Sequence, residues 1–233
     1  MHLVLFDIDG TLLSAGGAGR RAIHRALRDV FGSTGPDDYW FDGKTDRQIV
    51  RDLMRSDGHV DASIDARMDA VLSRYLACLG DELRDPSHPP RLHAGVLELL
   101  DALDDRADVV LGLLTGNLEV GARSKLAAAG LDPSRFVVGA FGSDHESRPE
   151  LPAVAQQRAR DRLGLELPGP AIVVIGDTPA DIACGQGIGA RSIGVATGRY
   201  TVEELGACGA GAVFEDLSHT YEVVAAITAS PNL

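Results

Sequence analysis

The sequence predicts an α/β protein in which a parallel sheet forms the core and an all-helical segment is inserted near the N-terminus. Short apolar runs alternate with helical segments from about residue 90 onward, and this alternation is typical of a parallel sheet with helices on both faces. A similar apolar run, residues 3–6, lies near the start of the chain. We therefore expect a core formed by residues 1–14 and 90–233, interrupted by a helical insertion of residues 15–89.

Each predicted element follows from its own pattern. In the insertion, apolar residues recur every three or four positions at 15–31 and 62–79, and a third helix is expected to begin at Thr45 or Asp46. In the core, apolar runs predict strands at residues 3–6, 108–114, 136–139, 171–175, 192–195 and 212–214. Helices are predicted at residues 96–103, 118–129, 150–163 and 218–229, with another before the strand at 192–195. This order of elements gives a three-layer, Rossmann-like core.

Composition and charge limit the classes of function. The 233 residues are 45% hydrophobic and 24% charged, which is ordinary for a globular protein. A net charge of −12 would repel nucleic acid and anionic membrane surfaces, so neither is an expected partner. Three widely spaced cysteines favour a reducing compartment, and no signal peptide or long apolar run is visible, so we expect a cytoplasmic protein. The sequence leaves open whether the chain is a monomer or a homodimer.

Polar residues follow three of the predicted strands at the point where each strand ends. Because parallel strands end at one edge of a sheet, we expect these side chains to converge there. Three carboxylates in one place repel one another unless a cation joins them, and all-oxygen ligation suits Mg²⁺. Each motif alone could be a solvated turn or a helix N-cap, but their occurrence at successive strand ends favours a site. The residues concerned are Asp7 and Asp9, then Thr115, Gly116 and Asn117, then Asp177 and Asp181.

These motifs resemble those of the haloacid dehalogenase superfamily. The segments Asp7-Ile-Asp-Gly-Thr-Leu-Leu, Leu113-Leu-Thr-Gly-Asn and Val174-Ile-Gly-Asp-Thr-Pro-Ala-Asp are similar to its first, second and fourth motifs. The insertion directly after the first motif resembles the α-helical cap of that superfamily, within which the chain is similar to phosphoglycolate-phosphatase-like hydrolases. The resemblance extends over essentially the whole chain and implies a phosphatase that acts on a small phosphate ester.

The resemblance assigns a role to each residue of the first two motifs. It implies that Asp7 attacks phosphorus to form an aspartyl phosphate, and that Asp9 protonates the leaving oxygen and then deprotonates the hydrolytic water. Thr115 would hydrogen-bond a phosphoryl oxygen, aided by backbone N–H groups near Gly116 and Asn117. The implied activity is Mg²⁺-dependent hydrolysis of a phosphoglycolate-like compound or a sugar phosphate.

The resemblance also implies a metal site and a cation beside the nucleophile. The implied Mg²⁺ ligands are the carboxylates of Asp7 and Asp177, the backbone carbonyl of Asp9, and Asp181 either directly or through water. The third motif of the superfamily usually has a lysine before a proline, but the matching stretch of this chain has an arginine, Arg148. We therefore expect Arg148 to steady Asp7 and the phosphate. The alternative cation is Lys125, in a helical run that is interpreted as a solvated face.

The helical insertion is expected to control substrate choice because it would close over the strand ends. Arg20 and Lys44 are candidates for binding the non-reacting end of the substrate, with surface charge as an equal alternative for each. Three other functions remain open: a β-phosphoglucomutase-like phosphomutase, a haloacid dehalogenase and a non-catalytic binding protein. Dehalogenation needs neither a second acid nor a metal, so Asp9 and Asp177 argue against it. The intact acidic residues argue against a non-catalytic role.

Overall fold

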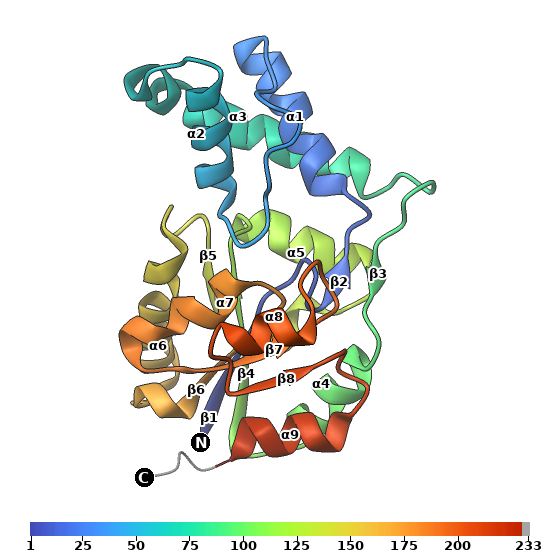
Figure 1. Cartoon of the computed structure of the whole chain (residues 1–233), viewed down its shortest axis with the longest axis vertical. Helices are drawn as coiled ribbons and strands as arrows, with labels where there is room; N and C mark the ends of the chain where they lie inside the picture. Colours follow the sequence, from blue (N-terminus) through green and yellow to red (C-terminus); the bar gives the residue numbers. More distant parts are fainter. Residues whose placement is uncertain (230–233) are drawn as a thin grey trace.

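The computed structural model describes residues 1–229 and contains the predicted parallel sheet. Its strands lie in the order β5-β4-β1-β6-β7-β8, and every neighbouring pair is parallel. They are β1 (His2–Phe6), β4 (Val109–Thr115), β5 (Val138–Phe141), β6 (Ile172–Gly176), β7 (Arg191–Val195) and β8 (Ala212–Phe214). The predicted fold class is confirmed, and the motif after β1 emerges near the centre of the sheet edge (Figure 1).

Helices cover both faces of the sheet, which explains why β1 is a continuous apolar run. The helices of the core are α4 (Val96–Asp104), α5 (Glu119–Ala128), α6 (Leu151–Leu163), α7 (Pro179–Cys184), α8 (Val202–Ala207) and α9 (Thr220–Thr228). Val4 and Phe6 share a hydrophobic cluster with α4, α5 and α9, while Leu3 and Leu5 share another with α6 and α7. Successive residues of β1 therefore point to opposite faces, and both faces are buried.

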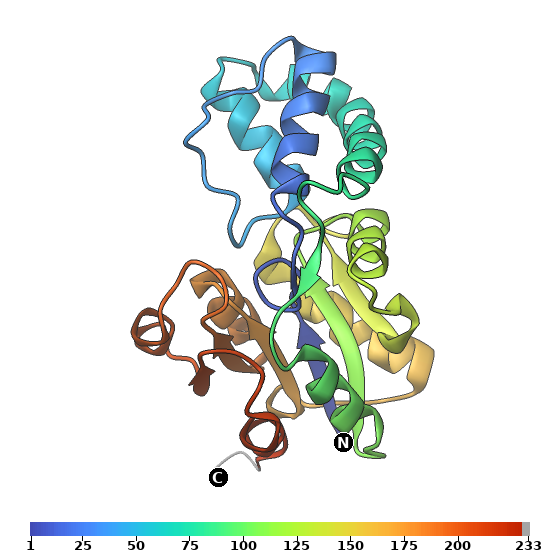
Figure 2. The same ribbon diagram turned by 90° about the vertical axis from the view of Figure 1, so that its right-hand side faces the viewer.

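The inserted residues form three helices, α1 (Ala18–Phe31), α2 (Asp46–Ser56) and α3 (Asp61–Glu82). They lie together beyond the carboxyl ends of the strands, at the top of Figures 1 and 2. α1 begins later than predicted because Gly16 and Gly17 have φ angles of 57° and 80°, outside the helical region. α2 begins after Thr45, whose hydroxyl accepts a hydrogen bond from the Gln48 N–H at 3.1 Å. None of the helices within residues 1–229 is long and apolar enough to cross a bilayer.

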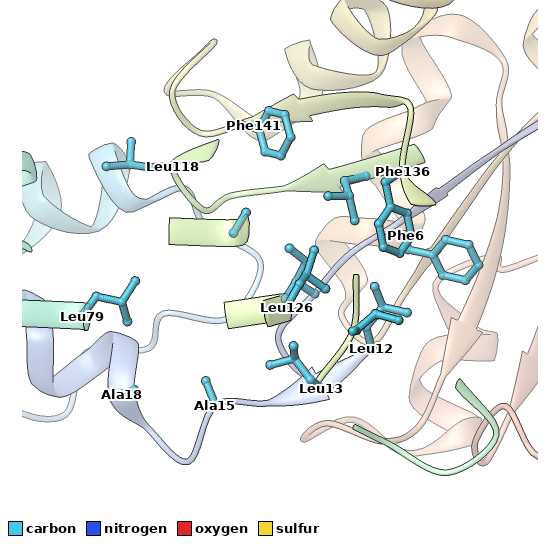
Figure 3. Close-up of a cluster of buried hydrophobic side chains, with 14 of the residues drawn as sticks. Phe6, Leu12, Leu13, Ala15, Ala18, Leu79, Leu118, Leu126, Phe136 and Phe141 are labelled. Atoms are coloured by element: carbon cyan, nitrogen blue, oxygen red, sulfur yellow. The ribbon is translucent and has the colours of Figure 1, made fainter. Parts of the chain in front are cut away.

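Two short strands that the sequence pattern did not predict connect the insertion to the core. β2 (Leu13–Ser14) and β3 (Arg91–Leu92) pair antiparallel, so the chain entering the insertion lies beside the chain leaving it. A two-residue pairing is too short to carry a period-2 pattern, so periodicity does not reveal it. Beside this pair, apolar side chains form a continuous cluster from Phe6 through Leu12 to Leu79 of α3 (Figure 3). The insertion is therefore held to the core by backbone pairing and by shared apolar packing.

Candidate active site

The carboxyl ends of β1, β4 and β6 open into a cavity of about 290 Å³ beneath the helical insertion. The three strand-end motifs meet there, because Asp7 and Asp9 follow β1, Thr115 ends β4 and Asp177 follows β6. α1, α2 and the loop between them supply the opposite wall. Every predicted site residue except Asp181 lines the cavity, namely Asp7, Asp9, Arg20, Lys44, Thr115, Gly116, Asn117, Arg148 and Asp177.

A tight turn after β1 explains the sequence Asp-x-Asp-Gly-Thr. The Asp7 N–H continues the sheet ladder by donating to the backbone of β6 at 2.9 Å, and the chain then turns back on itself. Gly10 has a φ of 85°, and a Cβ atom there would overlap the Asp177 carboxylate, so the position requires glycine. Thr11 donates from Oγ1 to Asp177 Oδ1 at 3.1 Å. The glycine and threonine of the motif thus bring Asp177 against the turn that carries Asp7.

Asp7 is buried and faces one arginine. Its side chain is 9% exposed, and Arg148 Nη2 lies 3.2 Å from its Oδ1. Burial has the largest effect on the pKa of Asp7 and raises it. Arg148 lowers this pKa, whereas the neighbouring Asp181 and Asp9 carboxylates raise it. The resulting pKa of Asp7 is about 6. Asp7 is therefore ionised at neutral pH, as a nucleophilic carboxylate must be.

Arg148 places a fixed positive charge inside the site. A 3₁₀ turn, Arg148–Glu150, precedes α6, and the arginine is 4% exposed. Its Nη2 contacts Asp181 as well as Asp7. Burial alone would lower the pKa of Arg148, but the Asp181 and Asp7 carboxylates raise it above its ordinary value. The guanidinium therefore stays charged between two buried carboxylates.

Asp181 is fully buried and uses both carboxylate oxygens within the protein. Oδ1 contacts Arg148, and Oδ2 accepts hydrogen bonds from the backbone N–H and the hydroxyl of Thr178 at 3.0 and 2.7 Å. The Thr178 hydroxyl accepts in turn from the Asp181 N–H, which completes a capping box at the start of α7. Asp181 therefore orients Arg148 and caps a helix, and its carboxylate also lies within the acidic group of Asp7 and Asp177.

The Asp177 carboxylate is buried beside other carboxylates and has no positively charged partner among residues 1–229. No basic side chain among residues 1–229 forms an ion pair with it, and burial, together with the Asp181 and Asp7 carboxylates, raises its pKa to about 9. Oxygen atoms of Asp7, Asp177 and Asp181 lie within 4.8 Å of one another. Gly198 closes the far side, since a Cβ atom there would overlap Asp177 Oδ2. This all-oxygen donor set fits Mg²⁺, with Asp7, Asp177 and Asp181 as the candidate carboxylate ligands.

Lys125 lies in the site, and the interpretation of its position as part of a solvated face is wrong. It is 4% exposed, and its Nζ lies 2.6 Å from both Asp9 Oδ2 and Asn117 Oδ1. Asn117 Nδ2 donates in turn to Asp9 Oδ2 and to Thr115 Oγ1, each at 2.8 Å. The Asp9 side chain is 42% exposed, far more than that of Asp7. The two aspartates after β1 therefore have different cations and different access to solvent.

Among the cavity residues, Asp46 and Tyr75 were not assigned to the site from the sequence, and Lys125 was considered only as the alternative to Arg148. Asp46 of α2 is buried and accepts from the Leu118 N–H at 2.8 Å; burial raises its pKa to about 6, and Lys125 opposes the rise. Tyr75 of α3 is fully buried and was assigned only to an apolar helical stripe. One signal was present for Lys125, which lies three residues after the buried Ala122 and so shares its helix face.

Arg20 and Lys44 line the cavity, but both also support the loop between α1 and α2. Arg20 Nη2 donates to the Tyr39 carbonyl at 2.8 Å, and its guanidinium lies 4.1 Å from the centroid of the Phe41 ring. Lys44 Nζ lies 3.8 Å from the centroid of the Tyr39 ring. These contacts fix the loop that forms one wall of the cavity, and substrate binding by either side chain stays a prediction.

Comparison with known proteins agrees with this geometry. The sequence profile of the haloacid dehalogenase-like hydrolases matches residues 4–186. The probable phosphatase IndB of Dickeya dadantii (strain 3937) is 29% identical over 210 residues, covering 87% of this chain and 84% of that protein. A hydrolase from Pseudomonas syringae superposes with a TM-score of 0.76 at 23% identity, over 98% of this chain and 100% of the other. A predicted phosphoglycolate phosphatase from Haemophilus somnus 129PT superposes with a TM-score of 0.70 at 20% identity, over 96% of this chain and 98% of the other.

The resemblance inferred from the motifs is therefore confirmed at the level of the family. The profile match extends over most of the chain and includes all three strand-end motifs as well as Arg148. The two solved structures share the fold along nearly the full length of both chains. On the combined basis of the motifs, the sheet and the profile match, this chain belongs to the haloacid dehalogenase-like hydrolases.

Proposed function

We propose that this protein is a Mg²⁺-dependent phosphatase that hydrolyses a small phosphate ester through an aspartyl phosphate on Asp7. The observation that carries the proposal is the difference between the surroundings of the two aspartates after β1. Asp7 is buried against Arg148, whereas Asp9 is partly exposed to the cavity and is hydrogen-bonded by Asn117 and Lys125. A nucleophile and a proton-transfer group need such distinct environments.

In the first step, a carboxylate oxygen of Asp7 attacks phosphorus while the bond from phosphorus to the ester oxygen breaks. The leaving oxygen takes a proton from the Asp9 carboxyl group, so an alcohol departs and Asp9 is left ionised. Thr115 accepts from Asn117 Nδ2, so its own hydroxyl proton can be donated to Asp7 or to a phosphoryl oxygen. Arg148 stabilises the negative charge of the transferring group.

In the second step, water attacks phosphorus and gives a proton to Asp9. The bond between phosphorus and Asp7 breaks, which releases inorganic phosphate and returns the Asp7 carboxylate and the Asp9 carboxyl group. Mg²⁺ bound by Asp7, Asp177 and the Asp9 carbonyl would supply charge neutralisation for the phosphate. Residues 15–89 would act as a cap over the core of residues 1–14 and 90–233, and the cavity of about 290 Å³ favours a small metabolite such as a phosphoglycolate-like compound or a sugar phosphate.

Hydrolysis of p-nitrophenyl phosphate, measured as nitrophenol and inorganic phosphate with Mg²⁺ or with EDTA, tests this proposal. We expect release by the wild type in Mg²⁺, little release in EDTA, and none above background for Asp7→Asn. Asp105→Asn, at an exposed position, should retain activity. A folded wild type that shows no Mg²⁺-dependent release would contradict the proposal, and an active Asp7→Asn would exclude Asp7 as the nucleophile. Nitrophenol without matching phosphate would indicate transfer to another acceptor, as in a phosphomutase.

A further inference from the structure

A buried lysine touches the residues that handle the proton and the phosphate in the proposed reaction. Lys125 lies on α5, is 4% exposed, and directs Nζ at Asp9 Oδ2 and Asn117 Oδ1, both at 2.6 Å. Burying an ammonium group costs free energy unless acceptors replace its water. Here the Asp9 carboxylate and the Asn117 amide oxygen take the place of water around the ammonium group. The buried carboxylate of Asp46 also lies close enough for Lys125 to lower the pKa of Asp46. The lysine is therefore held in one position.

The contact with Asn117 determines which way its amide group points. A charged lysine can only donate, so the Asn117 atom facing Nζ must be the oxygen. The amide nitrogen then faces the opposite way and donates to both Asp9 Oδ2 and Thr115 Oγ1 at 2.8 Å. A flipped amide would lose these donors and would set its nitrogen against the lysine. Lys125 thus orients the donor group that Asp9 and Thr115 share.

The contact with Asp9 determines which carboxylate oxygen is left open to the leaving group. Both donors, Lys125 Nζ and Asn117 Nδ2, reach Oδ2, whereas Oδ1 accepts no hydrogen bond from any residue among 1–229. The two donors direct their own protons at Oδ2. Oδ1 is therefore the oxygen left to face the leaving group, on a side chain that is open to the cavity.

We infer that Lys125 is a positioning residue that fixes Asp9 for proton transfer, while Arg148 serves Asp7. This inference rests on the proposed function and assigns the two buried cations to different steps. Arg148 contacts Asp7 and Asp181, and Lys125 contacts Asp9 and Asn117, so neither cation contacts the other's aspartate. Loss of Lys125 should therefore impair protonation of the leaving group more than attack by Asp7.

Two esters of similar shape separate these effects. p-Nitrophenyl phosphate releases a stable anion that needs little protonation, whereas phenyl phosphate has a poor leaving group that depends on the acid. The value of kcat/KM reports the first step, transfer to Asp7. We expect Lys125→Met to lower kcat/KM for phenyl phosphate by roughly 10- to 100-fold, within the range of general acid catalysis, and for the nitrophenyl ester by only a few-fold. The measured quantity is the ratio of kcat/KM for p-nitrophenyl phosphate to kcat/KM for phenyl phosphate, which Lys125→Met should raise.

A double mutant shows whether the effect passes through Asp9. Asp9→Asn should raise the same ratio, and adding Lys125→Met to that variant should leave the ratio unchanged. Arg123→Met is the matched control, since Arg123 lies on the same helix, is exposed and pairs with Glu119. Arg123→Met also removes one positive charge, but from a side chain that does not contact the site, so the ratio should keep the wild-type value. Lys125→Gln provides a second test that keeps a polar side chain in the buried position.

The outcomes distinguish this inference from the proposed function. A wild type that hydrolyses neither ester contradicts both. The inference alone is overturned if the wild type is active and the ratio is unchanged in folded Lys125→Met and Lys125→Gln. It is also overturned if Lys125→Met changes the ratio as much in the Asp9→Asn background as in the wild type. Unfolding of both Lys125 variants in thermal melts would assign the lysine a structural role and would likewise count against it.

Discussion

Removing the charge of Arg148 should destabilise the protein, and more strongly at pH 8 than at pH 5. The arginine is 4% exposed and contacts the carboxylates of Asp7 and Asp181. Removing one partner of a buried ion pair costs about 3–5 kcal/mol, because a carboxylate is left buried without compensation. For a chain of this length each kcal/mol corresponds to roughly 2–4 °C, so Arg148→Met should lower Tm by roughly 6–20 °C at pH 8.

The pH dependence follows from the pKa of Asp7, which is about 6 in the folded protein and 3.8 without perturbation. Between these values the folded state binds more protons than the unfolded state, so the contribution of Asp7 to stability falls as pH rises through this window. Without Arg148 the pKa of Asp7 lies higher still, and the fall continues above pH 6. At pH 5 Asp7 is mostly protonated in the wild type and depends less on the arginine, so the two proteins should differ less.

Thermal unfolding of both proteins in EDTA, followed by circular dichroism at pH 5 and pH 8, measures this difference. Arg84→Met is the control, because Arg84 is 75% exposed and its pair with Asp81 lies at the surface. Exposed pairs contribute little, so the control should melt close to the wild type at both pH values. A loss of Tm in Arg148→Met that is equal at the two pH values, or no larger than that of the control, would refute the electrostatic role.

Two further predictions concern Asp177. Because the pKa of Asp177 is about 9 without metal, Mg²⁺ binding at pH 7 should release about one proton and should raise Tm more at pH 8 than at pH 5. Calorimetry in two buffers of different ionisation enthalpy counts the protons, and a count of zero would contradict the assignment of Asp177 as a ligand. Gly198→Ala, whose Cβ would overlap Asp177 Oδ2, should abolish the rise in Tm caused by Mg²⁺. Gly187→Ala, whose added Cβ would meet no atom within 4 Å beyond the adjacent residues, should preserve the rise in Tm.

The strands and the aspartates at their ends could be predicted because they depend on local pattern. β1 is buried on both faces, so its residues form an uninterrupted apolar run that ends at Asp7. Gly10 and Thr11 contact Asp177 directly, so the motif itself contains the reason for the convergence of two strand ends. Parallel pairing then brings the ends of neighbouring strands to one edge without further information.

The surroundings of these aspartates could not be predicted in the same way, because they depend on contacts between distant segments. Lys125 was assigned to solvent from its charged and small neighbours, but in the structure it lies on the buried face of α5 and reaches Asp9. Asp181 was predicted as a metal ligand from its spacing, but its hydrogen bonds to Thr178 and its contact with Arg148 could not be foreseen. Spacing along the chain specifies which side chains can approach one another, and only packing specifies which hydrogen bonds they keep.

The charge balance around the cavity shows how an acidic chain can accept an anionic ester. The net charge of −12 opposes long-range attraction, so binding must depend on cations at short range. Arg148 and Lys125 are both buried, and Coulomb interactions there are stronger than in water. Each contacts one of the aspartates after β1, and Asp177 remains without a basic partner among residues 1–229. Two aspartates two residues apart can therefore have different surroundings because each has its own cation, and Asp177 is the position at which we propose that Mg²⁺ binds as a third cation.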